Sequence, residues 1–295
     1  MNYIGLNFGI VDEPNARVSV MDHGFLYGMG LFETFRTYKG VPFLLDKHLK
    51  RLAEGCLALG IQYEIDLEAT TTWITNVMEA NGLAEAYIRY TVSAGENVLG
   101  LPTTDYLSPN HFLIVKELPQ VSSDLYQNGK GLQRLYTRRN TPEGTVRFKS
   151  LHYMNNILAK RELMSYPEAS RYQAEGLMLD GQDYVAEGIV SNLFFVQKGS
   201  ICTPHLNTGI LPGITRELVM ELSIEQGLSC EEGWYTWADL VKAEEVWMTS
   251  SIQELIPITT LLLEDGSCIT VGKGTAGPIT TRLLQLYREK AGITK

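Results

Sequence analysis

Basic residues are in the minority in this sequence of 295 residues, with 25 Lys and Arg against 34 Asp and Glu and a net charge of −9. No long run of Lys or Arg offsets that acidity, which argues against nucleic acid or an anionic membrane surface as a partner. Apolar runs are far too short to cross a bilayer. The start, MNYIGLNFGIVDEPNARV, has no basic region followed by an apolar block. No signal peptide is therefore expected, and the cytoplasm is the default compartment.

The residues that form disulfides or bind metals are also few, with four cysteines and five histidines. No two cysteines form a Cys-x-x-Cys pair, and a chain of this length needs no disulfide bonds to fold. The histidines lack any ligand spacing such as His-Glu-x-x-His, so no metal site is expected. The P-loop pattern and the G-x-S-x-G pattern are both missing, which argues against a P-loop nucleotide enzyme and an α/β-hydrolase.

Strands and helices alternate in the first part of the chain. FETFRTYKGVPFLL predicts a hairpin that turns at Lys39-Gly40. A helix is predicted over 46–60, with Asp46 as its N-cap and an apolar face formed by Leu49, Leu52, Cys56 and Leu59. A second helix is predicted over 67–80. The strands AYIRYTVSAG and HFLIVKEL follow, and the long connection 97–110 between them is a candidate active-site loop.

The composition changes after Leu118. Residues 119–130 are polar and poor in apolar side chains, so we interpret them as a linker between a small α/β domain over 1–118 and a larger domain over 131–295. The second domain reads as hairpins, with turns at Asp180-Gly181 and Lys198-Gly199, mixed with helices. The predicted fold class is mixed α+β with two domains.

A lysine stands at the start of one predicted helix, RFKSLHYMNNILAKREL at 147–163. Its apolar residues at helical spacing predict a face turned to the core, formed by Leu151, Met154, Ile157 and Leu158. Lys149 lies at the leading edge of that helix. Two interpretations are open on this segment alone: the ammonium group reaches water along its aliphatic stem, or the lysine is a buried nucleophile.

Three further segments carry chemistry. Pro212-Gly213 precedes a helix start with Ile214 and Thr215, where free N–H groups and a hydroxyl could bind phosphate or simply cap the helix. Thr249-Ser250-Ser251 follows an apolar strand and is either a polar turn or a second phosphate contact. Glu187 ends a hairpin strand and is either solvated or functional.

Together these groups suit one cofactor, pyridoxal 5'-phosphate. A lysine holds the aldehyde as a Schiff base, an acid keeps the pyridine nitrogen protonated, and hydroxyl-rich turns bind the phosphate.

The sequence resembles the fold-type IV pyridoxal-phosphate enzymes, which include branched-chain and D-amino-acid aminotransferases and 4-amino-4-deoxychorismate lyases. The matching blocks occur in family order and cover nearly the whole chain. They are DHGFLYGMGLFETFR (22–36), HLKRL (48–52), FKSLHYMNNILAKRE (148–162), AEGIVSNLFFV (186–196), TPHLNTGILPGITRE (203–217) and EVWMTSSIQELIPI (245–258).

The resemblance implies roles for individual residues. Lys149 matches the Schiff-base lysine, Glu187 the partner of the ring nitrogen, and Arg51 in HLKRL the phosphate-binding arginine. The remaining phosphate contacts match Ile214, Thr215 and Ser251, with Ser250 adjacent. Tyr153 stands where many members place a tyrosine near the cofactor, and core packing is its alternative role.

Within the family, the N-terminal blocks look most like the lyases. Thr34 in Phe-Glu-Thr replaces the glycine usual in branched-chain aminotransferases and matches a threonine that lyases use beside the substrate; Tyr27 is expected in the pocket wall. Against this, Ala94 stands where lyases and D-amino-acid aminotransferases commonly have arginine, and Arg89 matches an arginine frequent in branched-chain enzymes. Arg89, Arg138 or Arg139 could recognise substrate carboxylates, or each could be an ordinary surface charge.

The resemblance therefore implies a lyase that converts 4-amino-4-deoxychorismate to 4-aminobenzoate and pyruvate, a step toward folate. Lys149 would act as the base, and Lys149 or a water held by Thr34 would protonate the leaving group. The alternatives are an aminotransferase acting on branched-chain or D-amino acids and a protein that binds the cofactor without catalysis. The family also implies a homodimer in which each site borrows a partner loop, for which 97–110 is the candidate.

Overall fold

The computed structural model describes residues 2–293, and the chain divides into two compact units. The first unit runs to Pro119 and also contains Phe148–His152, and the second contains Gln120–Arg147 and the chain from Tyr153 onward. The segment 119–130, expected as a linker, contains the short helix α4 (Leu125–Asn128) and the first residue of β7 (Lys130–Arg134).

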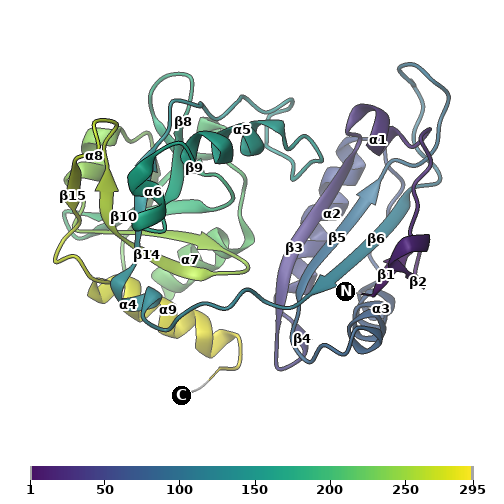
Figure 1. Ribbon diagram of the computed structural model, residues 1–295, viewed down its shortest axis with the longest axis horizontal. Helices are drawn as coiled ribbons and strands as arrows, with labels where there is room; N and C mark the ends of the chain where they lie inside the picture. Colours follow the sequence, from purple (N-terminus) through teal and green to yellow (C-terminus); the bar gives the residue numbers. More distant parts are fainter. Residues whose placement is uncertain (1, 294–295) are drawn as a thin grey trace. The chain divides into compact units, whose positions relative to one another are not determined.

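The first unit is built on one antiparallel sheet of six strands in the order β2-β1-β6-β5-β3-β4 (Figure 1). The strands are β1 (Tyr3–Leu6), β2 (Gly9–Asp12), β3 (Gly30–Tyr38), β4 (Val41–Pro42), β5 (Tyr87–Ser93) and β6 (Asn110–Lys116). The helices are η1 (Glu13–Asn15), α1 (His23–Tyr27), α2 (Leu45–Ala58) and α3 (Leu67–Ala80). Helix α2 packs on β3, and α3 packs on β1 and β6, so both cover one face of the sheet (Figure 1).

The two predicted helices of this unit are present. In α3, Asp66 caps the N-terminus by accepting a hydrogen bond from the Ala69 N–H at 2.8 Å. In α2, Leu49, Leu52 and Cys56 are buried as expected, but the N-cap is Leu44 in the left-handed region (φ 54°). Asp46 is therefore not the cap that the sequence suggested, and it lies in the first helical turn, where a carboxylate still favours the helix dipole.

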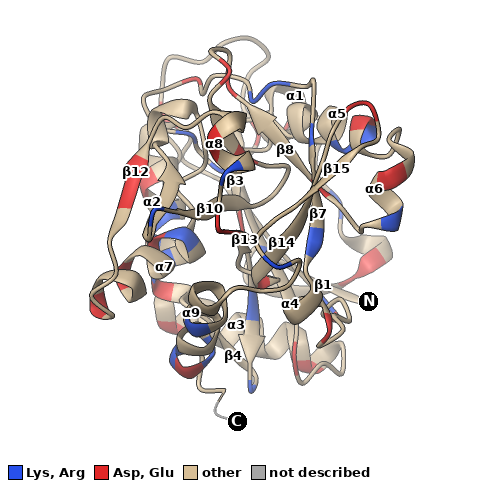
Figure 2. Ribbon diagram, turned by 90° about the vertical axis from the view of Figure 1, so that its left-hand side faces the viewer, with Lys and Arg blue, Asp and Glu red and all other residues tan. Residues whose placement is uncertain are grey.

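The second unit contains a mixed sheet of nine strands in the order β12-β11-β10-β13-β14-β7-β8-β9, with β15 paired to β14. Besides β7, its strands are β8 (Glu175–Leu179), β9 (Val185–Gly188), β10 (Asn192–Gln197), β11 (Ser200–Pro204), β12 (Cys230–Gly233), β13 (Glu245–Ser250), β14 (Glu254–Leu262) and β15 (Cys268–Thr270). Besides α4, its helices are α5 (Met154–Leu163), α6 (Pro167–Arg171), η2 (Leu206–Thr208), α7 (Ile214–Glu225), α8 (Trp237–Val241) and α9 (Pro278–Lys290). Acidic residues mark β12, and charges of both signs lie on α9 (Figure 2).

Two of the three predicted hairpin turns are tight turns, and Asp180-Gly181 lies in the longer connection 180–184 between β8 and β9. Lys39-Gly40 has φ of 53° and 76°, and Lys198-Gly199 has φ of 52° and 76°. Two consecutive positive φ values are the signature of the tight turn that matches the twist of antiparallel strands. Glycine at the second position lowers the cost of this backbone conformation.

The helix predicted over 147–163 is shorter than expected, and its core face is wrong. Helix α5 begins at Met154, and the apolar side chains expected inside are exposed: Met154 by 74%, Ile157 by 54% and Leu158 by 49%. The buried residues are instead Asn156, Ala159 and Leu163. Asn156 turns inward because its amide donates to the carbonyl of Ile189 and accepts from Arg139, so hydrogen bonding sets the orientation of this helix.

Within residues 2–293, no helix has both the length and the apolar character needed to cross a membrane.

Candidate active site

Lys149 lies on an extended segment that pairs with the start of β3. The carbonyl of Lys149 accepts a hydrogen bond from the Phe32 N–H at 2.9 Å, and the Leu151 N–H donates to the Gly30 carbonyl at 3.0 Å. Lys149 is half-buried, and its Nζ lies 4.7 Å from the centroid of the Phe32 ring. The lysine is thus held by strand pairing and not by a helix start, which fixes its backbone against the first sheet.

Arg51 belongs to a buried cluster in the first unit. On α2, His48 and Arg51 are one turn apart, and both side chains meet Glu33 on β3. The arginine binds the carboxylate in a bidentate manner, with Nε to Oε1 at 2.8 Å and Nη2 to Oε2 at 2.6 Å. His48 Nδ1 donates to Oε2 at 2.6 Å. Arg51 is therefore fixed in place and is not a mobile surface residue.

The charges of this cluster are well defined. Burial alone would raise the pKa of Glu33, but the guanidinium of Arg51 and the hydrogen bond from His48 outweigh it and lower the pKa to about 2. Burial lowers the pKa of His48 although the Glu33 carboxylate opposes this. At neutral pH the cluster is thus an ionised carboxylate, a guanidinium cation and a neutral imidazole.

The expected substrate residues lie in the same unit. Thr34 on β3 pairs directly with Arg89 on β5, and both side chains are half-buried. The guanidinium carbon of Arg89 lies 3.6 Å from the centroid of the Phe32 ring. Because alternate residues of a strand share a face, Phe32 and Thr34 lie on one face of the sheet and Glu33 on the other. Tyr27 lies at the end of α1, where its hydroxyl accepts a hydrogen bond from the Gly100 N–H at 3.1 Å.

Glu187 is the centre of a second buried cluster, in the second unit. Its Oε1 accepts from Arg139 Nε at 2.7 Å. Its Oε2 accepts from Asn192 Nδ2 at 3.1 Å and from the Leu211 N–H at 3.0 Å. The solvated role considered for this glutamate is therefore wrong, because the residue is only 4% exposed and has three donors.

Sequence reasoning missed the role of Arg139. The backbone of Arg139 continues beside β8, where its N–H donates to the Leu179 carbonyl at 2.8 Å. Along this extended stretch Arg138 and Arg139 point to opposite sides. Arg138 is exposed and pairs with Asp183 at 2.5 Å, whereas Arg139 is 8% exposed and also donates from Nη1 to Asn155 at 2.9 Å. Nothing in the local sequence around Arg138 and Arg139 indicates which of the two is buried.

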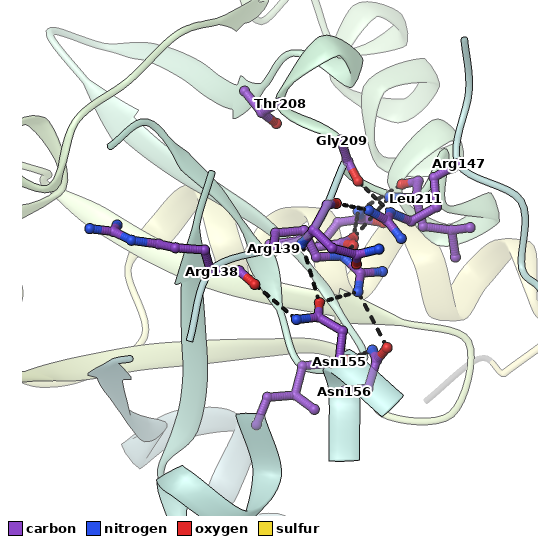
Figure 3. Close-up of polar contacts among 12 residues, drawn as sticks. Arg138, Arg139, Arg147, Asn155, Asn156, Thr208, Gly209 and Leu211 are labelled. Carbon is purple, nitrogen blue, oxygen red and sulfur yellow. Dashed lines mark hydrogen bonds and ion pairs between the residues drawn. The ribbon is translucent and has the colours of Figure 1, made fainter. Parts of the chain in front are cut away.

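A further buried arginine supports the same cluster. Arg147 donates to the carbonyls of Gly209 and Asn140 and so ties two loops together, one of which leads to Leu211 (Figure 3). Burial and the nearby positive charge of Arg139 lower the pKa of Arg147 to about 10, so it remains a cation at neutral pH.

Two of the expected phosphate residues, Thr215 and Ser251, meet near the start of α7. Its N-cap is Gly213, and the first N–H groups of a helix have no partner within the helix. Thr215 Oγ1 lies 3.3 Å from Ser251 Oγ, so the structure brings these two hydroxyls together. Ser250 Oγ accepts from the Gln253 N–H at 3.1 Å, the arrangement of a polar turn. Tyr153 is the N-cap of α5 and is half-buried. In the described part of the chain, no three His, Cys, Asp or Glu side chains are grouped to hold a metal ion.

Comparison with known proteins identifies the family of this chain. The family model described as amino-transferase class IV matches residues 30–261. The chain is 40% identical to the aminodeoxychorismate lyase of Bacillus subtilis (strain 168), over 97% of this chain and 94% of that protein. It is 34% identical to a putative branched-chain-amino-acid aminotransferase of Methanocaldococcus jannaschii, over 97% of this chain and 95% of that protein.

Solved structures show the same likeness. The T.th. branched-chain amino acid aminotransferase with pyridoxamine 5'-phosphate aligns with a TM-score of 0.84 at 29% identity, covering 99% of this chain and 94% of that one. The 4-amino-4-deoxychorismate lyase from Pseudomonas aeruginosa aligns with a TM-score of 0.81 at 29% identity, covering 97% and 98%. The chain belongs to the class IV amino-transferase family, and it is a fold-type IV, pyridoxal-phosphate-dependent enzyme.

Proposed function

We propose that this enzyme is a 4-amino-4-deoxychorismate lyase that forms 4-aminobenzoate and pyruvate. The observation that carries the proposal is the arrangement around Phe32. Lys149 Nζ and the Arg89 guanidinium both lie against its ring, and the Thr34 hydroxyl follows two residues along the same strand face. A base, a cation and a hydroxyl gathered on one face suit a substrate that carries carboxylates and must lose a proton. The 40% identity to the Bacillus subtilis lyase supports the same reaction.

The residues present fit pyridoxal 5'-phosphate. Within the described residues, Thr249 Oγ1 is buried and has no hydrogen-bond partner, next to the Ser250-Ser251 turn. The start of α7 offers backbone N–H groups and Thr215 to a phosphate. A carboxylate accepts about four hydrogen bonds, so Glu187 with three donors keeps capacity for a ring N–H.

We assign the cofactor contacts residue by residue. Arg51, Ile214, Thr215, Ser250 and Ser251 would bind the phosphate, Lys149 would bind the aldehyde carbon, and Glu187 the ring nitrogen. Tyr153 would lie beside the ring. The bound cofactor supplies an electron sink for the carbon that bears the substrate amino group.

The residues of this chain would then carry the proton. Lys149 in its neutral form removes the proton from the ring carbon that bears nitrogen. The bond from the neighbouring ring carbon to the enolpyruvyl oxygen breaks, and the ring becomes aromatic as 4-aminobenzoate. Lys149 or a water held by Thr34 returns one proton to the methylene carbon of the released enolate, which gives pyruvate. Tyr27 would line the pocket, and Arg89 would face a substrate carboxylate.

The test is 4-aminobenzoate formation, followed by fluorescence, with aminodeoxychorismate generated from chorismate and glutamine. The wild-type enzyme should form product, Lys149→Ala should form none while retaining its circular dichroism, and Thr34→Val should be slower than Thr34→Ser. Substantial activity of the Lys149→Ala enzyme would contradict the assignment.

A branched-chain or D-amino-acid aminotransferase is the second candidate. Arg89, which lies against the Phe32 ring, could also bind the carboxylate of an amino acid. In addition, Ala94 stands where lyases commonly have an arginine. An aminotransferase would change the cofactor's absorption band when amino acids are added without an acceptor, and a strict lyase would not. A protein that fails to turn over any amine would instead be a non-catalytic binder of the cofactor.

We also propose that the enzyme is a homodimer in which the 97–110 loop completes the partner's site. That loop exposes Val98 and Leu99 by 73% each and Leu101 by 89%. Leu101→Asp should lower the molecular mass measured in solution from that of a dimer to that of a monomer. A wild-type protein that already has the mass of a monomer would contradict the proposal. A cytoplasmic location stays a prediction of the sequence.

A further inference from the structure

We propose that Arg139 is a positioning residue that keeps the proton shared between Glu187 and the cofactor ring on the ring nitrogen. This rests on the proposed role of Glu187 as the partner of that nitrogen. Arg139 itself would touch neither cofactor nor substrate.

The geometry shows that Arg139 serves Glu187. The guanidinium uses Nε for Glu187 at 2.7 Å and Nη1 for Asn155 at 2.9 Å and Asn156 at 3.3 Å. The arginine side chain is 7% exposed and that of the glutamate 5%. Two asparagines at the start of α5 thus fix the cation, and the cation fixes the carboxylate (Figure 3).

This arrangement accounts for two buried polar residues, Asn156 and Arg147. The inward face of α5 carries Asn156 where an apolar residue was expected, because that face holds Arg139. Arg147 keeps the loop before Leu211 in place through the Gly209 carbonyl, so the third donor to Glu187 is also held.

The chemical consequence follows from charge. A proton shared by two bases resides on the stronger base, and a nearby cation favours the ionised form of a carboxylate. Asn192 Nδ2 and the Leu211 N–H also donate hydrogen bonds to this carboxylate, and such bonds favour its ionised form. With all three donors in place, the remaining capacity of the Glu187 carboxylate would be to accept a hydrogen bond from a protonated ring nitrogen. Without Arg139, the carboxylate competes for the proton and the ring becomes a weaker electron sink.

The experiment compares how apo-protein binds pyridoxal phosphate and its 1-deaza analogue, in which CH replaces the ring nitrogen. The wild-type protein should prefer pyridoxal phosphate. Arg139→Gln should reduce that preference by about tenfold or more, as expected for a lost charge-assisted hydrogen bond. The binding preference of Arg139→Lys should lie between those of the wild-type protein and Arg139→Gln. Arg138→Gln is the matched control, since it removes the adjacent but exposed arginine and should keep the wild-type ratio.

A second measurement separates this role from a general loss of structure. Once Glu187→Gln has removed the carboxylate, adding Arg139→Gln should change the binding ratio no further. If Arg139→Gln does not fold, Arg139→Lys can be compared in the wild-type protein and in the Glu187→Gln variant instead.

The inference is overturned if Arg139→Gln keeps the wild-type ratio, or if the wild-type protein does not distinguish the two cofactors. Because binding is measured without substrate, these outcomes are independent of the lyase assay. A wild-type protein that shows the expected ratios but forms no 4-aminobenzoate would refute the proposed reaction alone.

Discussion

Both units of this enzyme contain a buried glutamate paired with an arginine, and the pairs Glu33–Arg51 and Glu187–Arg139 are built in opposite ways. In the first unit Arg51 binds Glu33 with two nitrogens, and His48 adds a third bond. In the second unit Arg139 gives Glu187 only Nε, and the other donors are neutral: Asn192 and the Leu211 N–H.

The difference indicates which partner of each pair faces the chemistry. In the first pair we assign the arginine to the cofactor phosphate, and the acid holds it in place. In the second pair we assign the acid to the cofactor ring, and the arginine holds it. Both carboxylates accept three hydrogen bonds, so the difference lies in the arginine. The bidentate contact with Glu33 fixes the guanidinium of Arg51, whereas Arg139 is fixed by Asn155 and Asn156 and contacts Glu187 through Nε.

The largest effect is expected from breaking the first pair at its acid. Glu33→Gln leaves the Arg51 cation without its buried counterion, and removal of one member of a buried pair costs about 3–5 kcal/mol. Chemical denaturation of the apo-protein measures the loss. Glu54→Gln, which changes an acid that is 66% exposed in its pair with Lys50, is the control and should change stability little. A similarly small change for Glu33→Gln would show that the pair is not important for stability.

Acid should break the same pair without mutation. The pKa of Glu33 is about 2 in the folded protein against an ordinary value of 4.5. A lowered folded pKa gives stability that is present above pH 4.5 and is lost as the pH falls toward 2, about 3 kcal/mol in all. The measurement is the free energy of unfolding from pH 6 to the acid limit. The difference between wild type and Glu33→Gln should shrink over that window, and a constant difference would contradict the assignment.

A smaller change sharpens the comparison. Arg51→Lys keeps the charge but removes the bidentate contact, which should cost about 1.5–3 kcal/mol of stability. The variant should also bind pyridoxal phosphate more weakly while its affinity for pyridoxal, which lacks the phosphate, stays the same. An equal loss of affinity for pyridoxal phosphate and for pyridoxal would show that Arg51 does not bind the phosphate. Arg139→Lys is the reciprocal control, since its effect should follow the ring nitrogen.

The smallest effect is expected at Arg138. Its pair with Asp183 lies at the surface, with 44% and 75% of the two side chains exposed. Arg138→Gln should change the free energy of unfolding by less than about 0.5 kcal/mol and leave lyase activity unchanged. A loss of activity would mean that the exposed arginine, and not Arg139, serves the site.

Local signals in the sequence predicted much of the framework. The helix over 67–80, the apolar spacing of α2 and the Lys-Gly turns depend on neighbours within a few residues, and the structure contains all three. The candidate residues Thr215 and Ser251 meet as hydroxyls, as their segments suggested.

The predictions that were wrong or incomplete concern residues whose positions depend on contacts between distant parts of the chain. Lys149 is held by β3, more than a hundred residues earlier, so helical periodicity gave the wrong local structure for it. Asn156 faces inward only because Arg139 and Ile189 meet it there. Arg139 could not be told from Arg138 because strand alternation separates them only once β8 is in place.

The strand-like segment Phe148–His152 has a consequence for how this protein can be divided. The chain leaves the first unit after Pro119, returns at Phe148 and leaves again after His152, so no single cut separates the two units. A fragment that stops at Pro119 would lack the five residues that pair with the start of β3, including Lys149. Exchange of either unit between relatives, by recombination or by design, would therefore need three matched junctions, and Lys149 would stay with the smaller unit.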